Sequence, residues 1–299
     1  MSATRGSPTR TPADAEVVQP TRMERIRARL RGKLLILPLI VLVLWTIGPI
    51  VWAVSASFKP PLELFGSVNI WPANPTINSY RTVLFETDFF RFFLNSVLLS
   101  VTSMVIAISV SAAAGYGFSR YAFKWRHALL LLVLIPRLVP RVSLVVPLYQ
   151  VLDQIGLLDT YVGLIIVYSA TAVPLSTWIL AGFFHGLPRE IEEAAEVDGA
   201  STFQRFFKIA LPLAAPGLLV VAVLAMREAW NEFPFVLAFT SSAEMRTLPY
   251  QLFLLRDTLG IPDWSMIQAF TILSIAPLII VYLAFEKQIV AGLTSGAVK

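Results

Sequence analysis

Six apolar runs, each long enough to cross a bilayer as a helix, constrain the fold more than any other feature. They occupy Leu34 to about Ser57 and about 92–118, 128–148, 160–183, 212–240 and 265–285. A helix needs ~20 apolar residues to cross the hydrocarbon core, and each run reaches that length. The chain is 56% hydrophobic and 14% charged, whereas a soluble domain of this length would expose far more charge. We therefore predict an all-α, polytopic membrane protein with six transmembrane helices.

The segment ahead of the first run has a different composition. Residues 1–33 are rich in Ser, Thr, Pro and Arg, lack hydrophobic periodicity and end in a basic stretch. They are predicted to be a disordered basic cytoplasmic tail, and residues 34–299 a single membrane domain. The chain has no cysteine, and His127 and His185 lack ligand spacing, so no metal site is predicted. The net charge of +5 is explained by contact with membrane lipid and requires no nucleic acid.

The distribution of Lys and Arg predicts the orientation. With the N-terminus in the cytoplasm, 16 of the 24 basic residues lie inside and five lie outside. Basic residues next to spans remain preferentially in the cytoplasm. With six spans, both termini and the loop at about 184–211 are then cytoplasmic.

That loop is polar and has an ordered pattern of residues. Pro188 suits a first helical turn, and the segment that follows it consists mainly of good helix formers. Gly199 can supply a left-handed turn, and Ser201 stands where an N-cap belongs. The pattern predicts an acidic helix, a tight turn and a second, basic helix that enters the membrane at Pro212.

The spacing within the loop is specific. Glu193-Ala194-Ala195 is followed after three residues by Gly199, after nine more by Ile209, and after one more by Leu211-Pro212. This pattern resembles the EAA–G–I–LP signature of permease subunits of bacterial ABC importers. From Leu34 onward the chain is most similar to the carbohydrate, maltose-transporter branch. Matching stretches include Ser57-Phe58-Lys59, Asn95-Ser96, Ala114-Gly115-Tyr116-Gly117-Phe118-Ser119-Arg120, Pro147-Leu148-Tyr149, Ala229-Trp230-Asn231-Glu232-Phe233 and the tail from Gly292 to Lys299.

The resemblance implies an inner-membrane permease subunit of an ATP-driven sugar importer. It implies a second permease subunit, two ATP-binding subunits and an extracytoplasmic substrate-binding protein as partners. ATP and Mg²⁺ would bind the partner ATPases and not this chain, whose Gly32-Lys33 lacks the rest of a phosphate loop. The residues implied in coupling to the ATPase are Glu190, Glu193, Ala194, Ala195, Asp198, Gly199, Ala200, Ile209, Leu211 and Pro212.

Ionisable residues also occur inside the predicted spans. Each costs roughly 2.5–3.5 kcal/mol at bilayer depth, so it should face a partner or water. In the fifth run, Arg227, Glu228, Asn231 and Glu232 fall within one ~140° arc of a helix. This polar arc is either part of a translocation path or an internal ion pair that fixes packing. Trp230, within this segment, is the one tryptophan for which we predict stacking on a sugar ring.

Two arginines in the third run belong to the same candidate substrate path. Arg137 and Arg141 lie one turn apart and repel each other, so they need carboxylates or water nearby. Arg141 is expected near the depth of Glu228, which makes Glu228 and Glu232 plausible partners. Members of the resembled family usually have small or uncharged residues here. The arginines therefore leave open a phosphorylated or acidic sugar and, equally, an internal ion pair.

Two further features concern helix packing. Prolines within the runs, among them Pro136, Pro140 and Pro216, predict kinks that neighbouring helices can accommodate. Small residues between Ser109 and Gly117 predict a close approach of the second span to another helix.

Two other classes of protein fit the sequence less well. An ion-gradient-driven secondary transporter often has inverted repeats around a midplane site, and no convincing repeat is present. An intramembrane enzyme would need a His cluster, paired aspartates or a Ser/Lys dyad within spans, and every Asp lies outside the spans or at their ends. The chain is therefore predicted to have no catalytic residues. Co-purification of an ATPase would favour the importer over both alternatives.

Overall fold

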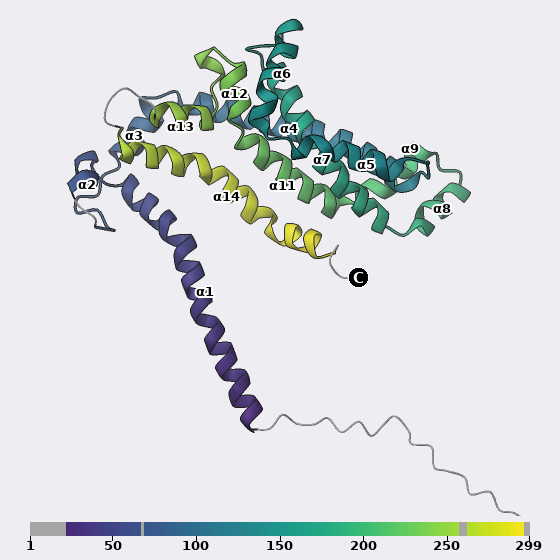
Figure 1. Cartoon of the computed structure of the whole chain (residues 1–299), viewed down its shortest axis with the longest axis horizontal. Helices are drawn as coiled ribbons and strands as arrows, with labels where there is room; N and C mark the ends of the chain where they lie inside the picture. The colour runs from purple at the N-terminus through teal and green to yellow at the C-terminus, as the bar shows by residue number, and fades with distance from the viewer. Residues whose placement is uncertain (1–21, 67–68, 257–261, 296–299) are drawn as a thin grey trace, which may run out of the picture. The chain divides into compact units, whose positions relative to one another are not determined.

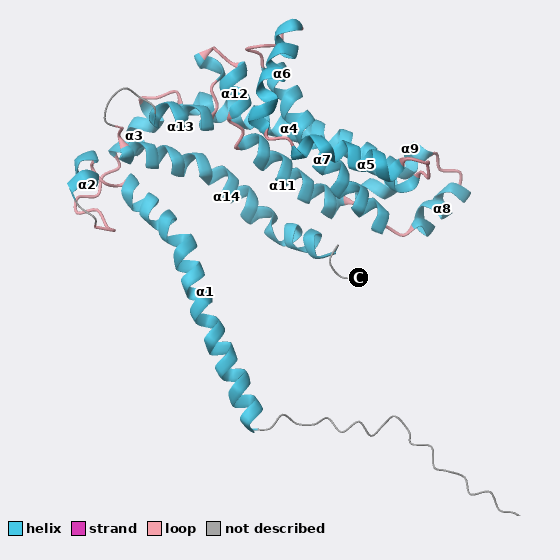
Figure 2. Cartoon of the chain, in the orientation of Figure 1, coloured by secondary structure: helices cyan, strands magenta, loops and turns pink. Residues whose placement is uncertain are grey.

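The chain folds into helices. The computed structural model describes residues 22–66, 69–256 and 262–295, and Figure 2 shows helices and loops, without strands, over these ranges. Figure 1 labels most of the elements. In chain order they are α1 Arg22–Ser57, α2 Pro61–Gly66, α3 Asn78–Phe85, α4 Phe89–Arg120, α5 Arg126–Leu134, η1 Ile135–Leu138, α6 Arg141–Gln154, α7 Tyr161–Gly186, α8 Arg189–Val197, α9 Thr202–Arg205, η2 Phe206–Ala210, α10 Leu211–Leu213, α11 Ala215–Trp230, α12 Pro234–Phe239, η3 Ala243–Met245, α13 Leu248–Arg256 and α14 Trp264–Ser295.

Contacts divide the chain into two units, Met1–Trp52 and Ala53–Lys299. In the first unit, helix α1 begins at Arg22, ahead of Leu34. Residues 22–33, which the sequence analysis placed in the disordered tail, are therefore helical, and the rest of that tail lies outside the described residues. Strong helix formers such as Arg and Leu extend the apolar helix toward its N-terminus. At the other end of the chain, α14 runs through Ser295, so the first part of the expected tail continues a helix, while residues 296–299 lie outside the description.

The core of the second unit is a bundle built on α4, α7 and α11. Helix α4 packs along α7, and α11 contacts both of them as well as α14 (Figure 1). At the end of the bundle that carries α8 and α9, Tyr116, Phe184 and Val221 belong to one buried apolar cluster. A second buried cluster, which includes Phe92, Trp230 and Phe270, joins α4, α11 and α14. The bundle thus holds α8 and α9 at one end, where they extend a framework of long helices.

Helices α4 and α7 approach each other closely at Gly115. A Cβ atom on Gly115 would lie 2.9 Å from the backbone nitrogen of Ala181 and 3.1 Å from Leu180. Gly117, two residues further along the same helix and therefore on roughly the opposite face, has nothing within 4 Å of the equivalent position. The small residues of the second apolar run therefore do mark a close contact, and Gly115 is where the backbones nearly touch.

Gly115→Ala is expected to destabilise the protein relative to Gly117→Ala. Both changes gain the same helix propensity, about 1 kcal/mol, so their difference isolates the overpacking penalty of about 1–3 kcal/mol. The measurement is the thermal unfolding midpoint of each variant in lipid nanodiscs. Equal midpoints would mean that α4 and α7 can move apart at Gly115 without loss of stability.

Two of the expected spans are bent instead of straight. The pair Arg126–Leu138 and Arg141–Gln154 is bent by 97°, and the pair Thr202–Leu213 and Ala215–Trp230 by 76°. At the first bend, Val139 is extended (ψ 126°) because the ring of Pro140 disfavours a helical residue before it. Among the described residues, four helices are long and apolar enough to cross a membrane, and the number rises to six if each bent pair counts as one span.

A polar clamp joins the loop before α7 to the loop after α12. The Asp159 carboxylate accepts hydrogen bonds from the backbone N–H groups of Ser241 (3.0 Å) and Ser242 (3.1 Å), and from both serine hydroxyls. Asp159 has φ +53°, a left-handed conformation that Asp tolerates better than most residues. Chiefly because the Ser242 hydroxyl donates to it, the pKa of Asp159 lies below its ordinary value of 3.8.

We expect Asp159→Ala to open this clamp. A depressed carboxyl pKa means that the contact stabilises the fold above pH ~4 and that this contribution is lost as the pH falls through the lower, folded-state pKa. Loss of a charged acceptor should speed amide hydrogen exchange at Ser241 and Ser242 about fivefold at neutral pH. Exposed Asp153 provides the control, since Asp153→Ala should leave both amides unchanged. Wild-type exchange rates in Asp159→Ala would contradict the prediction.

Candidate functional site

The predicted helix–turn–helix is present between α7 and α11. Helix α8 follows Pro188 and ends at Val197. Gly199 then takes φ +87°, and its N–H donates to the Glu196 carbonyl (3.0 Å). Ser201 caps α9 through a capping box with Gln204. The turn requires a residue that can adopt a positive φ, which explains why glycine stands at 199.

Two large apolar side chains of this helix–turn–helix are exposed. Val197 is 89% exposed and Phe203 is 70% exposed. Glu190, Glu193, Ala194, Asp198 and Gly199 are also exposed, while Ala195 and Ala200 are half-buried. Large apolar side chains that stay exposed beside acidic ones are typical of a surface that another protein covers. The acidic residues of this surface were expected from the sequence, whereas Val197 and Phe203 were not.

The other face of α8 is tied to α4. Glu192 is only 6% exposed, and its carboxylate accepts hydrogen bonds from the Tyr116 hydroxyl and from Nε of Arg120, each 2.7 Å long. Sequence reasoning counted Glu192 among the acidic residues of the helix but did not select it. The available signal was Tyr116 and Arg120, two polar side chains one turn apart at the end of an apolar helix.

The segment from α9 to α11 contains the remaining residues of the motif. Ile209 lies in η2, a single π-helical turn over Phe206–Ala210, and Leu211 and Pro212 form α10. Ala214 departs from helical geometry (ψ 3°), which produces the 76° bend before α11. The motif residues from Ile209 to Pro212 therefore build the joint between the exposed turn and the bundle.

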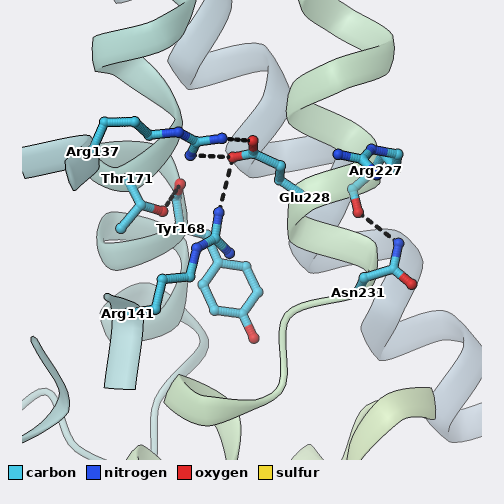
Figure 3. Close-up of polar contacts among 7 residues, drawn as sticks. All are labelled: Arg137, Arg141, Tyr168, Thr171, Arg227, Glu228 and Asn231. Carbon is cyan, nitrogen blue, oxygen red and sulfur yellow. Dashed lines mark hydrogen bonds and ion pairs between the residues drawn. The ribbon is translucent and has the colours of Figure 1, made fainter. Parts of the chain in front are cut away.

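The intramembrane charges form one cluster on α11, η1 and α6. Glu228 receives two hydrogen bonds from the Arg137 guanidinium and one from Arg141 (2.9 Å), as Figure 3 shows. The Glu228 side chain is 12% exposed, and those of Arg137 and Arg141 are 31% and 29% exposed. Two guanidinium groups thus share one carboxylate, and the cluster carries an excess positive charge. Of the two carboxylates expected as partners of these arginines, Glu228 pairs with both.

The continuous polar arc expected on the fifth span is not present. Helix α11 ends at Trp230, since Asn231 and Phe233 leave helical geometry ahead of Pro234. Buried Glu232 accepts hydrogen bonds from the N–H groups of Phe235 (3.0 Å) and Val236 (3.2 Å). Its carboxylate therefore satisfies the first turn of α12 and does not continue the Glu228 face.

The other polar residues of that segment do not join the cluster either. Arg227 is exposed and points away from Arg137 and Arg141 in Figure 3. The side chain of Asn231 donates to the Arg227 carbonyl (2.8 Å). The sequence-based grouping assumed an unbroken helix, and the break after Trp230 separates its members.

Trp230 does not have the position expected for stacking on a sugar. It is 3% exposed, its indole N–H donates to the Ser274 carbonyl (3.3 Å), and its ring packs edge-on against Phe93. The apolar cluster shared with α14 encloses this side chain. Trp230 is consequently a packing residue, and that expectation is wrong for this conformation.

Two further features bear on what the cluster can do. A small crevice between α7 and α11 is lined by Ala172, Ser176, Ala225 and Glu228, among others. Among the described residues, no three His, Cys, Asp or Glu side chains are grouped so that they could hold a metal ion.

The geometry has parallels among known proteins. Residues 106–294 match the family "Binding-protein-dependent transport system inner membrane component". The chain belongs to this family. The chain is 35% identical to the trehalose/maltose transport system permease protein MalG of Thermococcus litoralis, over 90% of this chain and 98% of the relative. It is 32% identical to the sulfoquinovosyl glycerol transport system permease protein SmoH of Agrobacterium fabrum, over 84% of this chain and 88% of the relative.

A solved structure shows the same fold. A chain of a bacterial ABC transporter involved in the import of the acidic polysaccharide alginate superposes with a TM-score of 0.77 at 21% identity, covering 89% of this chain and 98% of that one. As an inner-membrane component of a binding-protein-dependent transport system, the protein is a transport subunit and not an enzyme. The predictions of the family and of an all-helical, multi-pass membrane protein are confirmed.

Proposed function

We propose that this chain is the permease subunit of an ATP-driven saccharide importer. The observation that carries the proposal is the exposed turn between α8 and α9, which contains Glu193, Ala194, Ala195 and Gly199 of the EAA pattern and leaves Val197 and Phe203 uncovered. Relatives that carry trehalose, maltose or arabinooligosaccharides in their names support a saccharide as the substrate. The proposed partners are a second permease, two ATP-binding subunits with ATP and Mg²⁺, and an extracytoplasmic binding protein.

The proposed topology has six spans within residues 34–299. It counts α5 to α6 and α9 to α11 as one span each, in addition to the four long helices. The basic residues around 22–33, 120–126 and 205–208 support cytoplasmic termini and a cytoplasmic α8–α9 turn.

The exposed turn is proposed to dock on an ATPase subunit. Glu190, Glu193 and Asp198 would meet cationic or donor groups, while Val197 and Phe203 would enter an apolar cleft. The small side chains of Ala194, Ala195 and Ala200 would keep the docking surface narrow. Gly199 would set the angle between α8 and α9. A movement of this turn would reach α11 through Ile209, Leu211 and Pro212.

The charge cluster is proposed to border the translocation path. Glu228 lines the crevice between α7 and α11, and the side chains of Arg137 and Arg141 that bind it are 31% and 29% exposed. Exposed Arg227 and Asn231 would face the path or the second permease from the other side of α11. Glu232 and Trp230 support this region through the cap of α12 and through packing, without touching substrate. Because the cluster has more positive than negative charge, we propose a saccharide with an acidic group as its substrate.

Reconstitution tests the proposal. The chain is purified with its co-expressed partners, placed in proteoliposomes with the binding protein, and assayed for uptake of trehalose and of a uronate-containing disaccharide. Uptake that requires ATP and stops when the partner ATPase is inactivated is expected. Uptake that follows an imposed ion gradient without ATP would establish a secondary transporter instead.

A further inference from the structure

We propose that Glu192 is a positioning residue that fastens the α8–α9 turn to α4, so that a displacement of α8 moves α4 and α7 with it. The inference rests on the proposed docking of this turn on an ATPase. It adds a specific route by which the movement of the partner reaches the spans, and a residue on which that route depends.

Glu192 differs from the other acidic residues of its helix. Glu190, Glu193 and Glu196 are exposed, whereas Glu192 is turned inward and buried. Each of its carboxylate oxygens has its own donor, the Tyr116 hydroxyl on one side and the Arg120 guanidinium on the other. Within the described ranges, Glu192 is the carboxylate that pairs with Arg120, whose side chain is 9% exposed.

Two backbone contacts reinforce this attachment. The Arg120 guanidinium also donates to the Leu187 carbonyl (3.3 Å), and Arg189 donates to the Ser119 carbonyl (3.3 Å). The polar links therefore run in both directions between the last turn of α4 and the start of α8. Charge-assisted hydrogen bonds of this kind fix orientation as well as distance.

Tyr116 connects the Glu192 contact to the rest of the bundle. Its ring packs against Phe184 of α7 (5.6 Å between centroids) and Phe206 of η2 (5.0 Å). One side chain thus contacts α7 and η2 and, through Glu192, holds α8. A load applied to the exposed face of α8 would pass through Glu192 to α4 and α7.

The attachment of α8 to α4 depends on a buried ion pair and not on apolar packing alone. Apolar residues could stabilise the same junction without removing two charges from water. The ion pair instead makes the attachment conditional, because loss of either partner leaves a buried charge unpaired and favours separation of α8 from α4. This difference makes the proposal testable by changes of one or a few atoms.

The test follows the distance between α8 and α4 in the complete transporter. The chain has no cysteine, so single cysteines can be introduced at Ile191 and Val105, both exposed, for spin labelling. In the wild type, the Ile191–Val105 distance should be the same in the nucleotide-free and vanadate-trapped complexes, because the two helices move together. In Glu192→Gln and Tyr116→Phe, a second distance should appear, with the detached population raised about tenfold.

Glu196→Gln is the matched control on the same helix, since its amide oxygen can still accept from Arg205. It should retain the wild-type distance. If Glu192→Gln fails to assemble, Tyr116→Phe decides the question, because it keeps both the ring packing and the ion pair. A wild-type distance that changes on vanadate trapping, or wild-type distances in the assembled variants, would overturn the proposal while leaving the importer intact. A wild-type chain that recruits no ATPase would instead overturn the proposed function, and this inference with it.

Discussion

Gly199→Pro is expected to abolish coupling between ATP hydrolysis and uptake while leaving membrane insertion intact. Proline holds φ near −65°, whereas Gly199 has φ +87°, and proline lacks the N–H that donates to the Glu196 carbonyl. Helix α9 would then leave α8 in another direction, and the two halves of the exposed surface would no longer fit one cleft. We expect a fall of about tenfold or more in uptake per ATP hydrolysed, measured in proteoliposomes.

A graded series separates turn geometry from side-chain chemistry. Gly199→Asn should be tolerated best, since Asn enters the left-handed region most readily, and Gly199→Ala should be intermediate. Glu193→Lys tests the charge independently of the turn, because Glu193 is exposed and its reversal should not disturb this chain. Glu86→Lys, an exposed reversal in the turn after α3, is the control and should transport normally. Normal uptake in membrane-inserted Gly199→Pro and Glu193→Lys would rule out docking through this turn.

Glu228→Gln is expected to be the most destabilising neutral substitution in the charge cluster. It removes the carboxylate that two guanidinium groups share. Loss of one partner from a fully buried pair costs roughly 3–5 kcal/mol, and the partial exposure of both arginines reduces our expectation to about 2–3 kcal/mol. The thermal midpoint of the assembled complex should fall accordingly.

Arg141→Gln should change the stability of the complex only slightly. Arg137 keeps its two hydrogen bonds to Glu228, so the carboxylate stays paired and the midpoint should change by less than about 1 kcal/mol equivalent. If the surplus charge attracts an acidic saccharide, uptake of the uronate-containing disaccharide should fall about tenfold while uptake of a neutral one is spared. A large stability loss in Arg141→Gln with equal effects on both sugars would show that both arginines are structural.

The structure also determines which substitutions can distinguish a structural ion pair from a binding site in this cluster. From the sequence, Arg141 and Glu228 formed the expected pair, and neutralising both would have distinguished a structural pair from a binding site. With Arg137 on the same carboxylate, that double variant would strand Arg137. The informative comparison is therefore Glu228→Gln against either single arginine variant.

Run length and composition predicted the long helices because a membrane span is defined by length and apolarity alone. The helix–turn–helix could also be predicted from the sequence, since Pro188, Gly199 and Ser201 determine the backbone conformation of the residues next to them. The sharp bends were less accessible, because Pro136 and Pro140 permit a kink without setting its angle. A span that looks continuous in composition can therefore turn by 97° at a proline-containing junction.

The candidate site was predicted less completely, for a related reason. The arc from Arg227 to Glu232 assumed that one helix continues through Trp230, and its members separate where that helix ends. Burial of Trp230 and the inward orientation of Glu192 depend on which neighbouring helix lies against each face. Such neighbours are set by tertiary packing, which neither spacing nor composition encodes locally.

At the π-helical turn over Phe206–Ala210, the chain could lose one residue without rotating the helices on either side relative to each other. Such a turn holds one residue more than an α-helical turn, so removing a residue here would restore regular winding. The helices on either side would keep their orientation. A deletion elsewhere in α9 or α11 would rotate everything beyond it by ~100°. The nine-residue interval between Gly199 and Ile209 therefore fixes the rotation of α11 relative to the turn as well as their separation, and we expect a one-residue deletion within Phe206–Ala210 to leave that rotation unchanged.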